Sequence, residues 1–264
     1  MKNSLINILN QGNGILRLTL DDENNKNALS KAMIDELTEA INAANDNKEV
    51  KVIIIASTGN VFCSGHNLKE ITAARNNNDE GASYFKNLFE LCSSLMQLIV
   101  SCPKPVIAEV RGIATAAGCQ LVASCDLAVA DESARFGVNG VNIGLFCSTP
   151  MVALTRAVGR KKAFEMLVTG QFIEAKEAKE IGLINKVSKI GKLEETADEL
   201  ALQIASKLGD AVKIGKEAFY KQAEMSINDA YSYTGAVMAE NMMFEQTKKG
   251  INLFLDKKIP EWDQ

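Results

Sequence analysis

Residues 62–69 read FCSGHNLK, and residues 111–120 read RGIATAAGCQ. In both segments small residues follow a short apolar run and precede a helical pattern, so each predicts a turn from a strand into a helix. A third segment of this kind is FGVNG, at residues 136–140. Small side chains at such turns let a ligand approach the backbone closely, although tight packing of a helix on a strand also accounts for each segment taken alone.

Strands and helices are predicted to alternate around these turns. β-branched, nearly unbroken apolar runs at 50–56, 106–110 and 127–130 are typical of buried strands. Apolar residues recur every three or four positions at 83–100, and a helix of small residues is expected at 115–124. The repeating unit is a strand, a turn and a helix, which indicates an α/β fold.

The N-terminal and central parts carry further signals. Two apolar runs at 5–8 and 15–20 flank a glycine-containing turn and predict a β-hairpin. Ser30 is expected to cap a helix, because apolar residues follow it at helical spacing. Thr149 and Pro150 are expected to begin another helix, as a capping oxygen followed by a proline in the first turn.

The pattern becomes helical from Leu193 onward, after a last strand expected at 183–187. This change predicts a boundary near residue 195, between a core of residues 1–195 and a helical region of residues 196–264. The helical region carries methionine and aromatic residues on long amphipathic helices. These side chains either pack within the region or are covered by a partner subunit; they are Ile227, Ala230, Tyr231, Met238, Met242 and Met243.

Composition excludes several classes of partner. The 264 residues include 29 basic and 33 acidic side chains, for a net charge of −4, so no basic field favours nucleic acid or an anionic membrane surface. No apolar stretch approaches the roughly 20 residues of a membrane-spanning helix. The N-terminus lacks the pattern of an export signal, and the six cysteines are scattered without paired spacing. We therefore expect reduced thiols and a cytoplasmic protein.

The chain contains a single histidine, His66. One imidazole excludes an HExxH zinc helix and any site with two histidine ligands, and a Ser-His-Asp triad would have to use this residue. No metal is expected. The patterns GxGxxG and GxxxxGKS/T are also absent, which argues against nucleotide folds built on those loops. Backbone amides at the turns of 62–69 and 111–120, placed at helix N-termini, are suited to stabilise an oxyanion.

In this order and at these separations, the segments resemble the crotonase superfamily, also called the enoyl-CoA hydratase/isomerase family. The likeness covers nearly the whole chain. It includes, besides FCSGHNLK, the segments NAL (27–29), KPVIA (104–108) leading to RG (111–112), CDL (125–127), LTRAVG (154–159), TG (169–170), 175–183 and FL (254–255). The resemblance implies a spiral of ββα repeats, a helical C-terminal trimerisation region, and a homotrimer or a hexamer made of two trimers.

The resemblance also implies a function. Family members bind acyl-CoA thioesters and hold the thioester carbonyl with two backbone N–H groups, which here would belong to His66 and Ala117. Ala117 is usually glycine in the family, but alanine keeps the N–H. Coenzyme A enters as part of the substrate, and no cofactor is bound permanently. Its contacts would be Lys26, Ala28, Ser64, Gly65, His66, Asn67, Leu68, Lys257 and Lys258, where each lysine could equally be a solvated surface charge.

Two positions depart from the family pattern. Hydratases of the family use two glutamates to activate water and deliver a proton, and these align with Gln120 and Gly140. Neither residue is an acid or base near neutral pH. We therefore expect an acyl-CoA enzyme of the enoyl-CoA hydratase/isomerase type, a lyase of fatty acid metabolism, whose hydratase activity itself is open.

Three interpretations follow from this departure. In the first, the protein is an unusual hydratase or isomerase in which another group replaces the glutamates, with His66, Cys147 and Glu109 as candidates. Gln120 could also orient a water in such an enzyme. Alternatively, the protein is a malonyl-type acyl-CoA decarboxylase, because loss of CO₂ creates an enolate without a base. In the third, the chain binds acyl-CoA without turnover. Each of these side chains also has a purely structural interpretation. The His66 ring would then only pack against its neighbours, and Glu109 would form an ion pair with Arg111 or Arg135. Asp126 is expected to fix the turn from a helix into a strand.

Overall fold

The computed structural model describes residues 4–260 and 262 of the chain. Its larger sheet has six strands in the order β1-β2-β3-β5-β7-β10. Strands β1 and β2 form the antiparallel hairpin that the sequence predicts, and all other neighbours in this sheet are parallel. The strands are β1 (Ile6–Gly12), β2 (Ile15–Leu20), β3 (Val52–Ser57), β5 (Val106–Val110), β7 (Leu127–Asp131) and β10 (Lys186–Ser188).

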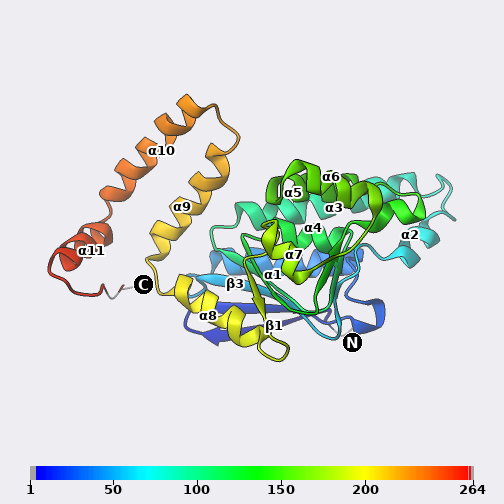
Figure 1. Cartoon of the computed structure of the whole chain (residues 1–264), viewed down its shortest axis with the longest axis horizontal. Helices are drawn as coiled ribbons and strands as arrows, with labels where there is room; N and C mark the ends of the chain where they lie inside the picture. Colours follow the sequence, from blue (N-terminus) through cyan, green and yellow to red (C-terminus); the bar gives the residue numbers. More distant parts are fainter. Residues whose placement is uncertain (1–3, 261, 263–264) are drawn as a thin grey trace.

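A smaller sheet of four strands has the order β4-β6-β8-β9. Its members are β4 (Val61–Cys63), β6 (Ile113–Thr115), β8 (Arg135–Gly137) and β9 (Ile173–Glu174). The chain passes from the larger to the smaller sheet in the pairs β3–β4, β5–β6 and β7–β8. Helices return it to the larger sheet after β4 and β6, whereas after β8 the chain first adds β9 to the smaller sheet, and α7 then leads to β10. This path confirms the predicted spiral of ββα repeats (Figure 1).

Helices surround the two sheets. None of those in the described part of the chain is long and apolar enough to cross a membrane. The α-helices are α1 (Lys31–Asp46), α2 (Leu68–Ala74), α3 (Ala82–Ser101), α4 (Ala117–Ser124), α5 (Ser148–Ala157), α6 (Arg160–Thr169), α7 (Ala175–Glu180), α8 (Leu193–Ala205), α9 (Gly209–Gln222), α10 (Ile227–Met242) and α11 (Glu245–Leu255), and two 3-10 helices are η1 (Glu23–Asn25) and η2 (Asn139–Ile143).

The core lies on both faces of the larger sheet. In β5, Val106, Ala108 and Val110 point into the main cluster, which also contains the buried faces of α1, α3 and α4. Ile107 points to the other face, where α8 covers the sheet. Because α8 packs on the sheet, the part of the chain that leaves the core begins at α9. The division at residue 195 itself stays a prediction.

Some of the helix starts predicted from the sequence agree with the structure and others do not. The Ser30 cap is confirmed, because Met33 N donates to Ser30 Oγ at 3.1 Å. The predicted Thr149 cap is wrong: α5 begins at Ser148, after Cys147, without a side-chain capping bond. The helix expected from 115 begins at Ala117, because the residues before it form β6.

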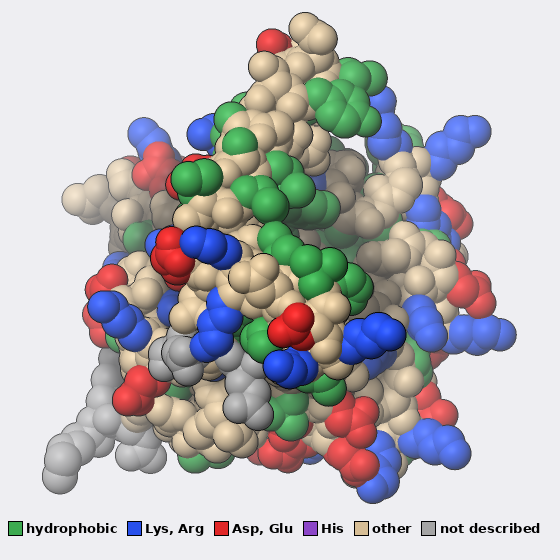
Figure 2. All heavy atoms as spheres, turned by 90° about the vertical axis from the view of Figure 1, so that its left-hand side faces the viewer, with side chains coloured by type: hydrophobic (Ala, Val, Ile, Leu, Met, Phe, Trp, Pro, Cys, Tyr) green, Lys and Arg blue, Asp and Glu red, His purple; other side chains and the backbone are tan. Residues whose placement is uncertain are grey.

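Helices α9, α10 and α11 project from the core, on the side opposite α2 (Figure 1). No residue of α10 is buried, and Ile227 and Tyr231 are 79% and 78% exposed. Figure 2, which views the molecule from this side, shows hydrophobic side chains gathered along the projecting helices. We call α9–α11 the arm.

A buried polar cluster attaches the arm to the core. Lys216 of α9 donates to the backbone oxygens of Ile99 and Lys104, both at 3.0 Å, and to Asp126 Oδ2 at 2.6 Å. Tyr220 donates to Asp126 Oδ1 at 2.9 Å. Asp126 also accepts from the N–H of Val106 at 2.6 Å, so its side chain ties the turn between α4 and β7 to the start of β5.

Candidate active site

The two predicted oxyanion turns lie against each other. Strand β4 leads to His66 and strand β6 leads to Ala117, and these strands are paired in the smaller sheet. Gly65 has φ +89°, and a Cβ placed on it would lie 3.3 Å from the backbone N of Ala117. Gly118 is equally constrained, because its Cβ would lie 2.1 Å from the backbone oxygen of Cys63. The small residues therefore allow the two backbone segments to approach closely.

The N–H groups of His66 and Ala117 are not used in hydrogen bonds within the described part of the chain. Ala117 is the first residue of α4, so its N–H has no partner within the helix, and neither amide donates a hydrogen bond to any other described residue. The positive end of the α4 dipole adds to the field at this position. An oxyanion hole uses a pair of N–H groups that have no partner within the protein; that these two amides form one stays a prediction.

Ala116 adopts an unusual backbone conformation directly before this helix. Its φ of 50° and ψ of −120° lie in a region that residues with a Cβ rarely occupy. Its N–H donates to the oxygen of Gly137 at 2.9 Å, which ties the turn to β8. Sequence reasoning missed this residue, because nothing in the run of small residues 114–118 distinguishes the position that needs positive φ.

The His66 ring is held on one side only. Its Nδ1 lies 3.2 Å from the backbone oxygen of Leu29, and its edge meets the Phe89 ring at a centroid distance of 5.5 Å. Since a carbonyl only accepts, Nδ1 carries the proton in this contact and Nε2 presents a lone pair. Nε2 is buried and has no partner among the described residues. Burial lowers the pKa of His66, which keeps the ring neutral at physiological pH.

Gln120 lies one turn into α4 from the Ala117 amide. Its residue is 4% exposed, and its Oε1 is buried without a hydrogen-bond partner in the described part of the chain. Side chains of a helix tend to lean toward its N-terminus, and the N-terminus of α4 is Ala117. The residue thus adds an uncharged acceptor beside the oxyanion turns.

Gly140 lies in η2 and is packed against residues 145–147 of the segment that follows η2. A Cβ on Gly140 would be 2.4 Å from the backbone oxygen of Leu145 and 2.8 Å from Cys147 Sγ. No side chain fits there unless residues 145–147 move. Cys147 therefore borders the position, but burial raises the pKa of its thiol and keeps it protonated.

Comparison with known proteins agrees with this arrangement. Residues 10–264 match the family described as enoyl-CoA hydratase/isomerase. The chain belongs to this family. A human relative, enoyl-CoA hydratase domain-containing protein 3, mitochondrial, is 46% identical over 252 residues, which are 96% of this chain and 82% of the relative. A putative enoyl-CoA hydratase of Thermus thermophilus is 32% identical over 92% of this chain and 95% of its own length.

Solved structures show the same fold. An enoyl-CoA hydratase of Mycobacterium smegmatis superposes with a TM-score of 0.94 at 45% identity, covering 98% of this chain and 99% of that one. The human domain-containing protein 3 superposes with a TM-score of 0.92 at 44% identity, over 98% and 100% of the two chains. Five vertebrate relatives carry the word mitochondrial in their names, so the relatives do not support the cytoplasmic location expected for this chain.

The structure brings together most of the residues that the family resemblance assigns to coenzyme A. The segment from Lys26 to Ala28 lies beside residues 64–68: Ser64 N donates to the oxygen of Lys26 at 3.2 Å, and Leu29 N to that of Gly65 at 2.8 Å. Asn27 holds this contact, because its Nδ2 donates to the oxygen of Val61 at 2.8 Å. The segment NAL is part of the family resemblance, but the sequence alone does not indicate this positioning role of Asn27.

Lys257 and Lys258 are separated from these contacts within the chain. They follow α11, which lies at the end of the molecule opposite α2 and residues 64–68 (Figure 1). Lys258 Nζ lies 3.6 Å from Asp256 at the surface.

Glu109 is not a catalytic candidate, because it lies on the face of the larger sheet that α8 covers, away from the oxyanion turns. It pairs with Arg17, which also bonds Asp198 Oδ1 of α8 at 2.7 Å, on the face of the larger sheet that α8 covers. The pairing with Arg111 or Arg135 expected from the sequence is therefore wrong, because strand β2 places Arg17 there instead. Burial raises the pKa of Glu109 and the charge of Arg17 opposes this shift. Arg17, paired with both Glu109 and Asp198, joins α8 to the sheet.

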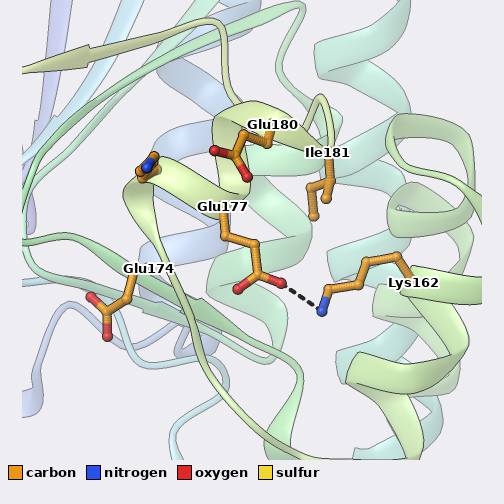
Figure 3. Close-up of a pocket in the computed structure, with 6 residues that line it drawn as sticks. Lys162, Glu174, Glu177, Glu180 and Ile181 are labelled. Carbon is orange, nitrogen blue, oxygen red and sulfur yellow. Dashed lines mark ion pairs between the residues drawn. The ribbon is translucent and has the colours of Figure 1, made fainter.

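A charged surface pocket lies apart from this site (Figure 3). Lys162 of α6 and Glu177 of α7 face each other across it, with Nζ and Oε1 2.6 Å apart. Its other lining residues are Glu174, Lys176, Glu180 and Ile181. None of the residues expected from the sequence to contact the substrate lines this pocket.

Proposed function

We infer that this chain is an acyl-CoA thioester enzyme of the enoyl-CoA hydratase/isomerase type. The observation that carries the proposal is the pair of unbonded N–H groups on His66 and Ala117, in two turns packed against each other. Bound to a thioester oxygen, this pair stabilises the enolate that forms when a bond at the α carbon is made or broken. The substrate brings its own coenzyme A, and no permanently bound cofactor is proposed.

The groups that transfer protons decide the reaction type. Gln120 is uncharged, and the packing over Gly140 leaves no space for a carboxylate. Hydration or isomerisation would then use a water held by Gln120 or the neutral His66 ring. Decarboxylation of a malonyl-type thioester needs no base, which keeps it as the second candidate. Binding of acyl-CoA without turnover is the third.

A panel of enoyl-, 3-enoyl- and malonyl-type CoA thioesters, analysed by mass spectrometry, tests the proposal. Addition of 18 Da would identify a hydratase, an unchanged mass with a moved double bond an isomerase, and loss of CO₂ a decarboxylase. Saturable binding without product would select the binding protein. Failure of every thioester to bind would overturn the family assignment of the site.

Ala117→Pro tests the oxyanion hole itself. Proline is tolerated at the first position of a helix, so this change deletes the N–H while α4 remains. We expect turnover to fall by about 10²- to 10³-fold, the usual effect of losing one oxyanion donor. Arg160→Pro is the matched control, because Arg160 is the exposed first residue of α6. Equal activity of both variants would remove the Ala117 amide from the mechanism.

We also propose a homotrimer or hexamer. In such an assembly the exposed stripe of the arm is covered, and Lys257 and Lys258 of one chain approach the coenzyme A of another. A cytoplasmic location stays a prediction.

A further inference from the structure

Helix α2 begins directly after the His66 turn, yet it buries little apolar surface. Within α2, which the structure describes in full, only Ala74 is buried; Ile71 is half-buried, and Leu68 at the start of the helix is 54% exposed. Apolar burial therefore supplies little of the free energy that holds this helix in place. The position of His66, two residues before Leu68, thus depends on the polar contacts of α2.

The side chain of Glu70 links α2 to two other helices. Its Oε2 accepts a hydrogen bond from the Tyr84 hydroxyl of α3 at 2.9 Å and another from the backbone N–H of Lys31 at 3.3 Å. Lys31 is the first residue of α1, so the carboxylate also lies at the positive end of that helix dipole. Burial and the bond to Glu70 raise the pKa of Tyr84 to about 12, which keeps its hydroxyl protonated as a donor.

The two segments that Glu70 bonds also contact the His66 turn. Just before α1, the N–H of Leu29 donates to the oxygen of Gly65 at 2.8 Å, and the oxygen of Leu29 lies 3.2 Å from His66 Nδ1. On α3, the Phe89 ring meets the edge of the His66 ring at a centroid distance of 5.5 Å. The turn is therefore held between the start of α1 and α3, and Glu70 joins α2 to both.

We propose that Glu70 is a positioning residue for the backbone N–H of His66, acting through its bonds to Tyr84 and to the first N–H of α1. This inference rests on the proposed acyl-CoA function, in which the His66 amide binds the thioester oxygen. Without the carboxylate, α2 loses both polar links and the turn before it gains freedom. Because the amide stabilises charge that develops in the transition state, its misplacement lowers turnover more than substrate binding.

Steady-state kinetics with a thioester that is turned over test the inference. Glu70→Ala should lower kcat and kcat/KM by about tenfold each and leave KM within about twofold, as loss of a transition-state interaction implies. Tyr84→Phe removes one of the two bonds and should lower kcat by less, and it replaces Glu70→Ala as the test if that variant does not fold. Glu70→Gln should restore most of the activity, because its amide oxygen can accept both bonds. Glu90→Ala, at an exposed position of α3, is the control and should match the unaltered protein.

The single histidine of the chain gives a second readout that needs no turnover. The Phe89 ring displaces the proton NMR signals of the His66 ring, because the two rings are in contact. In Glu70→Ala these signals should move toward the values of free histidine. They should stay close to those of the unaltered protein in Glu70→Gln and in Glu90→Ala.

The outcomes separate two failures. An unchanged kcat in Glu70→Ala, or a loss that Glu70→Gln does not restore, would overturn this inference while leaving the acyl-CoA function intact. His66 signals that do not respond to Glu70→Ala would overturn it as well. If no thioester is turned over, the NMR comparison alone decides whether Glu70 holds the turn. Failure of every thioester to bind would instead overturn the proposed function.

Discussion

Ala116 holds a strained conformation at the entrance to α4, and glycine would adopt it without a Cβ penalty. Ala116→Gly should therefore raise the free energy of unfolding by about 1 kcal/mol, since relief of strain exceeds the added freedom of the unfolded chain. Ala153→Gly, inside α5, should lower it by about 0.5–1 kcal/mol. Urea unfolding measures both. A loss of stability in both variants would show that the backbone at 116 is unstrained.

The stability of the protein should depend on pH through His66. Its folded pKa is lowered by burial, so the unfolded chain takes up a proton first as the pH falls. The stability contributed by the neutral ring should thus be complete above the unfolded pKa of about 6.5 and decline below it. Subtracting the unfolding free energies of His66→Gln from those of the unaltered protein between pH 5 and 8 isolates this term. A difference that is constant with pH would contradict it.

Small residues and helix starts are local signals, and they predict the turns that contain His66 and Ala117. The choice of these two amides as oxyanion donors comes from the family resemblance and stays a prediction. The sequence alone could not place Glu109, since the partner Arg17 lies on a strand distant in the sequence, and only the order of strands in the larger sheet brings them together. The close packing of residues 145–147 against Gly140 could not be predicted from the sequence either, because it depends on the path of that segment in the fold.

At the scale of elements, α9 joins the arm to the core through Lys216, which is 9% exposed. Lys216→Met should leave Asp126 as an uncompensated buried charge and lower the free energy of unfolding by about 3 kcal/mol. Hydrogen exchange should show faster exchange of the α9 amides than in the unaltered protein. Lys213→Met, at an exposed position of the same helix, should change stability by less than about 0.5 kcal/mol. Equal effects of the two changes would rule out the cluster as the anchor.

The elements themselves were predictable where periodicity is strong. Helix α1 and the hairpin follow local patterns, whereas the strands of the smaller sheet have only two or three residues each and give no periodic signal. The predicted strand at 183–187 lies at Lys186–Ser188, because Leu183 and Ile184 are buried in the core before the strand begins.

At the scale of the whole molecule, the arm presents an apolar stripe. At 100° per residue, Ile227, Tyr231, Met238 and Met242 fall within about 60° of one face of α10. Met238→Lys should shift the mass in solution from three or six times 28.6 kDa toward a single chain. Ala236→Lys, on the opposite face, should leave the mass unchanged. Light scattering distinguishes the results, and a single-chain mass for the unaltered protein would refute the proposed assembly.

The carbonyl of Leu145 over Gly140 also restricts how this protein could change through evolution. If a single codon change introduced glutamate at position 140, the new side chain would clash with the backbone of Leu145. The segment 145–147 would have to be displaced first, by substitutions that bring no catalytic gain of their own. Acquisition of both glutamates that the family resemblance aligns with Gln120 and Gly140 would therefore take several mutations in a set order, although Gln120 is itself one nucleotide away from glutamate.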